Sequence, residues 1–193
     1  MRHRYLIFNK PFGVLSQFSG ERASLADYIP VKGVYPVGRL DRDSEGLLLL
    51  TSEGELQHRL TDPAYNHPRT YWVQVERIPS EAALAQLARG VIIEGQRTRP
   101  ARVGLLPEPD DLPRRNPPVR FRKTVPTAWL EMTLTEGRNR QVRKMTAAVG
   151  HPTLRLIRAA IGGLRLEGLP PGKWRDLTSE ELQRLSAGIR AHG

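Results

Sequence analysis

The pattern of hydrophobic and polar positions predicts a chain built largely of strands. Residues 5–11, "YLIFNKP", are an apolar, β-rich run ended by proline, and residues 46–52, "GLLLLTS", are a continuous aliphatic run typical of a strand covered on both faces. Residues 69–75, "RTYWVQV", and 127–135, "TAWLEMTLT", have the composition or the alternation of half-buried strands. Residues 153–169, "TLRLIRAAIGGLRLEGL", predict a strand, a turn and a second strand.

Two short helices are predicted from their first turns. Ser52 and Glu55 have the S-x-x-E spacing of a capping box, so we expect a helix over "GELQHRLTD" that ends before the next proline. Thr178 and Glu181 have the same spacing before "SEELQRLSA" and predict the last helix of the chain.

Two more helices are predicted from their apolar faces and glycine stops. Ser80 is expected to cap a helix that carries Leu84 and Leu87 on one face and ends at Gly90. Residues 137–150, "GRNRQVRKMTAAVG", also have a helical apolar stripe and a final glycine. Because strands outnumber helices and follow one another directly, we predict an α+β fold with a largely antiparallel sheet rather than a βαβ fold.

Length and composition limit the class of protein. A chain of 193 residues is long enough for one domain, or one domain of two lobes, and we expect a single domain over 1–193. The absence of cysteine excludes disulfides and thiolate metal sites. The longest aliphatic run, Leu47 to Leu50, is too short for a bilayer, and the N-terminus lacks the pattern of a signal peptide, so we expect a cytoplasmic protein.

The basic residues are unevenly distributed. The chain has a formal net charge of +10, and its basic residues are mostly arginine, which suits bidentate phosphate contacts. High-GC codon usage would also favour arginine, but it would not remove acids locally. Residues 137–165 contain no acid and seven basic residues, which indicates a nucleic-acid surface: Arg138, Arg140, Arg143, Lys144, Arg155, Arg158 and Arg165.

A proline-rich segment over 107–126 predicts an extended loop. It carries five basic residues, so we interpret it as an RNA-contacting loop rather than a spacer: Arg114, Arg115, Arg120, Arg122 and Lys123.

An acidic cluster interrupts this basic chain in "GRLDRDSEGLLLLTSEG", residues 38–54, where Asp41, Asp43 and Glu45 precede the leucine run. The cluster matches the start of a calcium-binding EF-hand loop, but the twelfth position is Ser52 instead of glutamate. A structural role is the second interpretation, in which Asp43 and its neighbour bond to backbone amides in a turn. The calcium match thus fails at its last ligand, and the structural interpretation does not account for Asp41.

The third interpretation is catalytic. A carboxylate placed where RNA must bind repels the phosphates, so its presence indicates chemistry, and nearby arginines favour its ionised form. An ionised carboxylate can act as a nucleophile on an anomeric carbon, and C1′ of a nucleoside is such a carbon.

Four motifs of this sequence, taken together, resemble those of a known family. "GRLDRDSEGLLLLT" resembles the catalytic motif of the pseudouridine synthases, in particular the branch that modifies ribosomal RNA at single sites (small-subunit type A; large-subunit types B, E and F). "RTYWVQV", "EGRNRQVRKM" and "LRLIRAAIGGLRL" resemble the family's other motifs, in order and over almost the whole chain. Most of the branch begins with an RNA-binding module of the S4 type. This sequence is expected to lack it, and together with its proline-arginine loop it resembles type E.

The resemblance implies the fold, the reaction and the partners. We expect a two-lobed pseudouridine synthase fold, flanked by helices, with a central RNA-binding cleft. The N1–C1′ bond of one uridine in 23S rRNA would break, the base would rotate, and C5 would bond to C1′, without cofactor or metal. The substrate would be 23S rRNA, free or in an assembling large subunit. We expect no membrane partner and a monomer.

The resemblance also implies the site residues. Asp41 is the catalytic carboxylate, acting at C1′ or through proton abstraction and a glycal; both routes stay open. Arg143 pairs with it, Tyr71 contacts the target base, and Leu156 lines the pocket. A basic residue usually precedes the tyrosine, and Arg69 stands nearby. Tyr71 could alternatively be an ordinary strand core residue.

Seven basic residues are candidate phosphate contacts, although each could be a solvated charge: Arg39, Arg42, Arg138, Arg140, Lys144, Arg155 and Arg158. On the helix, Arg143 lies at the margin of the stripe through Val142 and Met145, so it should be partly buried, whereas Lys144 should point toward solvent or RNA. A non-catalytic RNA-binding or ribosome-assembly protein is the rival interpretation, and it leaves Asp41 unexplained.

Overall fold

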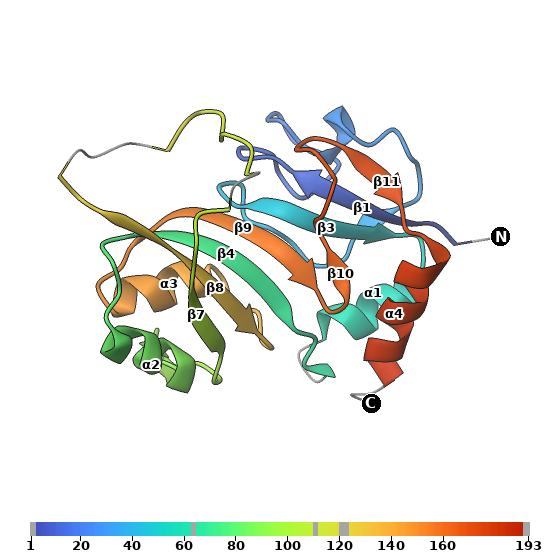
Figure 1. Cartoon of the computed structure of the whole chain (residues 1–193). Coiled ribbons are helices and arrows are strands. Elements are labelled where there is room, and N and C mark those ends of the chain that lie inside the picture. Colours follow the sequence, from blue (N-terminus) through green and yellow to red (C-terminus); the bar gives the residue numbers. More distant parts are fainter. Residues whose placement is uncertain (1–2, 63–64, 110–111, 120–123, 191–193) are drawn as a thin grey trace. The chain divides into compact units, whose positions relative to one another are not determined.

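The chain forms two compact units in the computed structural model, which describes residues 3–62, 65–109, 112–119 and 124–190, without the side chains of 186–190 (Figure 1). Unit 1 comprises Met1–His67 and Arg158–Gly193, and unit 2 comprises Pro68–Ile157. Strand β9 (Thr153–Ile161) continues from unit 2 into unit 1.

Unit 1 is a small antiparallel sheet with helices. Strand β1 pairs with β3 on one side and with β11 on the other, both antiparallel, and β10 forms a hairpin with the end of β9. Besides part of β9, the elements of unit 1 are β1 (Tyr5–Lys10), the 3-10 helix η1 (Leu25–Asp27), β2 (Tyr35–Pro36), β3 (Glu45–Thr51), α1 (Gly54–Thr61), β10 (Leu164–Arg165), β11 (Trp174–Asp176) and α4 (Ser179–Arg190).

The leucine run of β3 is buried on both faces, as its sequence predicts. Leu47 and Leu49 pack with Leu56 and Leu60 of α1 and Leu185 of α4. The alternate residues of β3 and β1 pack on the other face with η1, since side chains alternate along a strand: Leu6, Phe8, Leu48, Leu50 and Leu25. Figure 1 shows α1 and α4 on the same side of these strands.

Unit 2 is built on the strand order β9-β4-β8-β7, with α2 and α3 packed on one face (Figure 1). The core contains Leu87 of α2, Val142 and Met145 of α3, and the inward residues of the strands. The elements are β4 (Arg69–Glu76), α2 (Glu81–Arg89), β5 (Ile92–Ile93), β6 (Gln96–Arg97), β7 (Arg102–Leu106), β8 (Thr127–Leu134) and α3 (Gln141–Ala148).

Most of the predicted elements are confirmed, and the strand pairs with a described register are antiparallel. Ser80 caps α2 by accepting the N–H of Ala83, and Gly90 ends that helix with φ +87°. Thr178 and Glu181 form the predicted capping box, each side chain accepting the other's backbone N–H.

One helix cap and one helix start were wrongly predicted, although α1 begins at Gly54 as expected. The N-cap of α1 is Glu53 rather than Ser52, because the Ser52 hydroxyl accepts the backbone N–H of Arg4 at 2.9 Å. Helix α3 begins at Gln141 rather than at 137, because Arg140 adopts the left-handed conformation and breaks the helical path before it. The sequence also gave no sign of the short strands β2, β5, β6, β7 and β11. None of the described helices is long and apolar enough to cross a membrane.

Candidate active site

The segment around Asp41 is held on both sides by a neighbouring loop of unit 1. The Ser16 hydroxyl donates to the Leu40 carbonyl at 2.8 Å and accepts the Leu40 N–H at 3.1 Å. On the other side of Asp41, Arg42 accepts the Gly13 N–H at 2.8 Å, and its Nε donates to the Gly13 carbonyl at 3.1 Å. The half-buried carboxylate is therefore carried on a fixed backbone.

A backbone turn links Asp41 to the buried strand that follows it. The Ser44 N–H donates to the Asp41 carbonyl at 3.0 Å, and β3 begins one residue later. A turn is therefore present here, but it is closed by main-chain atoms, and the predicted bond of the Ser44 side chain to a backbone amide is not made in the described part of the chain. The Ser44 hydroxyl is buried and finds no hydrogen-bond partner among the described residues.

A buried ammonium group lies within the electrostatic range of the acidic cluster. Lys10, the last residue of β1, is 0 % exposed, and its Nζ donates to the Val14 carbonyl at 2.7 Å and the Pro11 carbonyl at 3.0 Å. Burial lowers the pKa of Lys10 to about 8, against the opposite effect of the three carboxylates Glu45, Asp43 and Asp41. The acidic cluster of this basic protein thus has a cationic partner inside its own unit.

Arg158, the first residue of unit 1 on β9, belongs to the interior rather than the surface. Its side chain is buried, and its Nε donates to the Leu47 carbonyl of β3 at 2.8 Å. This burial corrects the expectation of a phosphate contact, because a guanidinium that bonds a strand carbonyl inside the fold is not presented to a polyanion.

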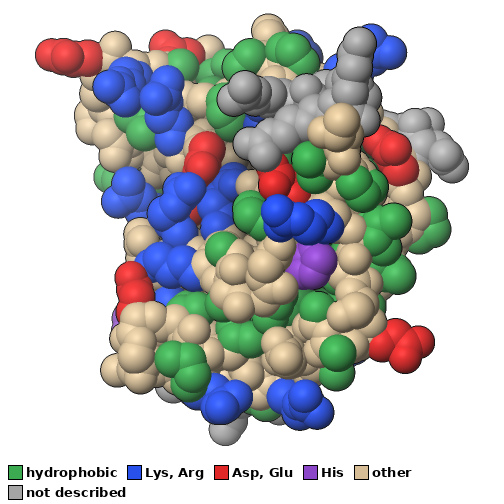
Figure 2. Space-filling view, turned by 90° about the vertical axis from the view of Figure 1, so that its left-hand side faces the viewer, with side chains coloured by type: hydrophobic (Ala, Val, Ile, Leu, Met, Phe, Trp, Pro, Cys, Tyr) green, Lys and Arg blue, Asp and Glu red, His purple; other side chains and the backbone are tan. Residues whose placement is uncertain are grey.

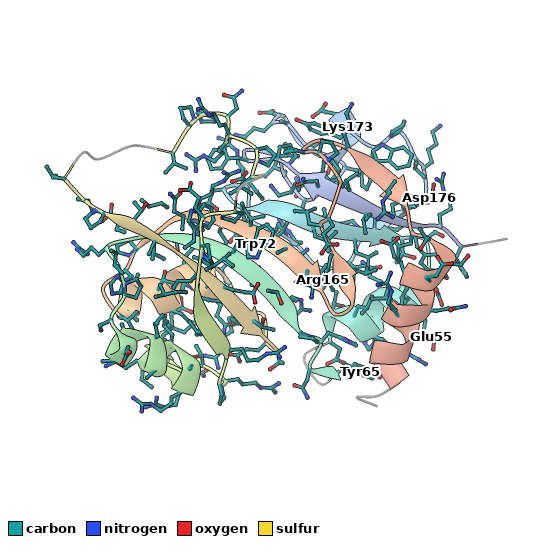
Figure 3. All side chains as sticks on the ribbon, in the orientation of Figure 1. Glu55, Tyr65, Trp72, Arg165, Lys173 and Asp176 are labelled. Carbon is teal, nitrogen blue, oxygen red and sulfur yellow. The ribbon has the colours of Figure 1, made fainter. Side chains whose placement is uncertain are left out.

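Tyr71 and Leu156 lie in the same hydrophobic core of unit 2. Leu156 is buried, and the half-buried Tyr71 packs against this core from β4. The neighbouring Trp72 points to the opposite face of β4, where its indole N–H lies 3.4 Å from Glu131 Oε2 (Figure 3). The structure thus brings together the residue predicted to contact the target base, Tyr71, and the one predicted to line the pocket, Leu156.

Arg143 and Lys144 differ less in burial than their sequence positions predicted. Arg143 is half-buried with a buried Nε, as expected at the margin of the apolar stripe. Lys144 is also half-buried, and its Nζ pairs with Glu94 Oε1 at 2.7 Å. The orientation of Lys144 toward solvent or RNA stays a prediction, and the β5–β6 hairpin supplies a largely exposed acid beside it.

Arginines also fasten the described part of the proline-rich loop to β9. Arg155 is buried and donates from Nη2 to the Pro113 carbonyl at 2.9 Å, so it too departs from the expected phosphate contact. Arg115 bonds to the carbonyls of Pro117, Pro118 and Leu154. Arg114 is exposed, whereas Arg120, Arg122 and Lys123 lie outside the described residues.

The other candidate phosphate contacts lie at or near the surface. Arg39, Arg42 and Arg140 are exposed, and Arg138 is partly exposed with its Nη2 bonded to the Arg97 carbonyl. In Figure 2, Lys and Arg side chains gather on the face in view, with a few Asp and Glu side chains among them. The basic side chains on this face are therefore interspersed with acidic ones.

Each unit carries a different part of the predicted site. Asp41 belongs to unit 1, and Tyr71, Arg143 and Leu156 belong to unit 2. Sequence reasoning missed Lys10, although a lysine that closes an otherwise apolar strand was a usable signal. It also missed Glu136, which immediately precedes the glycine of "EGRNRQVRKM". No group of three His, Cys, Asp or Glu side chains among the described residues could hold a metal ion.

The sequence and the structure were compared with those of known proteins. A family model described as RNA pseudouridylate synthase matches residues 4–148. The chain is 56% identical over 177 residues to the Ribosomal large subunit pseudouridine synthase E of Vibrio vulnificus, covering 91% of this chain and 75% of the relative. It is also 56% identical over 174 residues to the protein of the same name from Xanthomonas campestris, covering 88% of this chain and 93% of the relative.

More distant relatives and a solved structure agree. The Ribosomal large subunit pseudouridine synthase B of Bacillus subtilis is 38% identical over 194 residues, covering 98% of this chain and 73% of the relative. A crystal structure of a pseudouridylate synthase superposes with a TM-score of 0.81 at 29% identity, covering 95% of this chain and 74% of that one. The chain belongs to the RNA pseudouridylate synthase family, so it is an isomerase. The predicted α+β fold of that family is confirmed.

Proposed function

We propose that this protein converts one specific uridine of 23S rRNA to pseudouridine, with Asp41 as the catalytic carboxylate. The observation that carries the proposal is the fixed loop around Asp41. Hydrogen bonds to Ser16 and Gly13 hold Leu40 and Arg42, the two neighbours of Asp41. The buried strand β3 begins four residues after Asp41. The names of the relatives, which specify the large ribosomal subunit, support the choice of rRNA.

The reaction is an isomerisation in which no atoms are gained or lost. The N1–C1′ bond of the uridine breaks, the base rotates, C5 bonds to C1′, and the proton of C5 is replaced by one on N1. Asp41 acts either by attack on C1′ or by removing a proton in a glycal route. Both routes require an ionised carboxylate.

The residues of unit 2 are proposed to bind the target nucleotide. Tyr71 stacks on the extruded base. This stacking offsets part of the free energy of unstacking, roughly a few kcal/mol. Leu156 lines the apolar side of the base. Arg143 is expected to pair with Asp41; the two residues belong to different units, so this pairing stays a prediction.

RNA affinity is proposed to come from arginines at the surface. Arg39, Arg42 and Arg140 are exposed, and Arg114 is exposed on the fastened part of the loop, so these guanidinium groups are accessible to phosphates. The substrate is 23S rRNA, free or in an assembling large subunit, and the protein acts as a monomer. A purely RNA-binding protein would need these arginines but not Asp41.

The test compares two neighbouring acids on a 23S rRNA transcript. Asp41→Asn should lower the single-turnover rate by about 10⁴-fold or more, the order seen when the acting group of an enzyme is removed. Its RNA affinity should stay equal or rise slightly, because a charge that repels phosphate is gone. Asp43→Asn, the matched control, should keep substantial activity. An active Asp41→Asn beside an inactive Asp43→Asn would transfer the role to Asp43.

A further inference from the structure

We propose that Glu136 and Gln141 are positioning residues that hold the first turn of α3, and with it Arg143, in the geometry that catalysis needs. The inference rests on the proposed function, which places Arg143 in the substrate site. Neither residue is proposed to touch the RNA.

The start of α3 needs external support, because its own cap is poor. The N-cap residue Arg140 has φ +51° and ψ +33°, the left-handed conformation, and makes no side-chain cap hydrogen bond. A non-glycine residue in this conformation costs about 1–2 kcal/mol. The backbone that leads into the helix is therefore strained, and other contacts must hold it in place.

Gln141 provides the first of these contacts. Its side chain is only 4 % exposed, and both ends of its amide are bonded. Oε1 accepts the backbone N–H of Arg138 at 2.9 Å, and Nε2 donates to Glu136 Oε1 at 2.6 Å. The first residue of α3 thus bonds back to the turn that precedes it, which fixes the direction in which the helix begins.

Glu136 connects this turn to another part of unit 2. Its Oε1 also accepts the backbone N–H of Arg99 at 2.8 Å, and its Oε2 lies 3.4 Å from Arg138 Nη2. The same Arg138 nitrogen donates to the Arg97 carbonyl at 2.9 Å. One carboxylate therefore ties together Gln141, the turn before α3 and the chain segment that follows β6.

The position of Arg143 depends on this network, because Arg143 lies two residues after Gln141 in the same helical turn. A displacement of about 1 Å in a positioning group can lower a catalytic rate by about 10²-fold. The Lys144–Glu94 ion pair also contacts α3, but Glu94 is largely exposed, and exposed pairs contribute about 0–1 kcal/mol. Glu94 therefore offers a matched control on the same helix.

Three variants separate positioning from stability. Glu136→Ala removes the acceptor for both the Arg99 N–H and Gln141, and should lower the single-turnover rate per folded molecule about 10- to 100-fold. The dissociation constant for the 23S transcript should change less than about threefold, because no phosphate contact is lost. Glu136→Gln keeps the Oε1 acceptor and should recover most of the rate. Glu94→Gln should match the wild type.

A fourth variant gives a pH signature. Gln141→Glu would place a second carboxylate in contact with Glu136, and two such groups can share a single proton but cannot easily both ionise. The rate of Gln141→Glu per folded molecule, with the folded fraction measured by circular dichroism, should fall as the pH rises from 5 to 8 relative to the wild type.

The possible results bear differently on the two proposals. If the wild type forms pseudouridine while Glu136→Ala and Gln141→Glu have wild-type rates per folded molecule, the network is structural only and the inference fails. If Glu136→Ala does not fold, the pH profile of Gln141→Glu is the test: a rate that falls from pH 5 to 8 relative to the wild type supports the inference, and a profile parallel to that of the wild type refutes it. A wild type that forms no pseudouridine in the 23S transcript would instead refute the proposed function.

Discussion

The buried lysine of unit 1 makes the stability of this protein depend on pH in a way that one substitution can isolate. Lys10→Met removes the ammonium group and its two hydrogen bonds to the Pro11 and Val14 carbonyls, and keeps a flexible side chain of similar length in the same space. The variant therefore has no ionisable group at this position, while the neighbouring carboxylates stay.

The magnitude follows from the pKa. Burial lowers the pKa of Lys10 from 10.5 to about 8, whereas the unfolded chain keeps the ordinary value. Between these two values the folded protein has released a proton that the unfolded chain still binds, so the stability of the wild type rises with pH through this window. Relative to pH 7, the gain is about 1 kcal/mol at pH 9 and about 2–3 kcal/mol at pH 10.

Urea unfolding of both proteins at pH 7, 9 and 10 measures this gain. Other titrating groups affect both proteins alike, so the difference in free energy of unfolding, wild type minus Lys10→Met, isolates the lysine. That difference should increase by the amounts given above, which at pH 10 corresponds to about 1 M in the urea midpoint difference. A difference that is constant from pH 7 to 10 would refute the argument, because it would mean that Lys10 keeps its ordinary pKa in the fold.

Two further predictions concern stability. Gly90→Ala should destabilise the protein by about 3 kcal/mol in urea unfolding, because the added Cβ would lie 2.2 Å from the Thr98 carbonyl oxygen and φ is +87°. Gly95→Ala, with φ +77° and no atom within 4 Å of its Cβ, should cost only about 1 kcal/mol; equal losses would show that the close approach at Gly90 is not what matters. Hydrogen bonding to Arg175 lowers the pKa of Glu181 to about 2, so this group stabilises the fold above pH 4.5 and loses its effect as the pH falls toward 2. The stability advantage of the wild type over Glu181→Gln should therefore shrink from pH 5 to pH 2, and an advantage independent of pH would contradict the pairing.

Local sequence signals predicted an element well only where no distant residue competed for the same atoms. Thr178–Glu181 and Ser52–Glu55 have the same capping spacing, but only the first forms a capping box. The Ser52 hydroxyl instead accepts the N–H of Arg4, which is 48 residues away in the sequence. A contact of this range cannot be read from a four-residue pattern.

The short strands were missed for a related reason. Strand β11, Trp174–Asp176, has three residues and no alternation to detect. It exists because β1 offers a free edge, along which Leu6 pairs with Asp176 and Phe8 with Trp174. By contrast, β3 was predictable because its four consecutive leucines must be buried on both faces wherever the strand lies.

The acid-free stretch over 137–165 shows where charge arguments from sequence lose accuracy. A segment without acids suggests a positive surface only if no acid from elsewhere approaches it, and Glu94 pairs with Lys144 from outside the stretch. Burial removes Arg155 and Arg158 from the surface as well, and each donates to a backbone carbonyl of a different chain segment. A buried guanidinium is costly unless such bonds satisfy it.

The same bonds explain why arginine suits these two positions of β9. A guanidinium carries five N–H donors in a planar group, so it can reach a carbonyl on a neighbouring strand or loop and still keep its charge. Arg158 thereby joins β9 to the strand that follows the acidic loop, and Arg155 joins it to the loop at Pro113. Two arginines that the sequence assigned to RNA thus bond to backbone carbonyls of the fold, and RNA binding is proposed only for the exposed arginines.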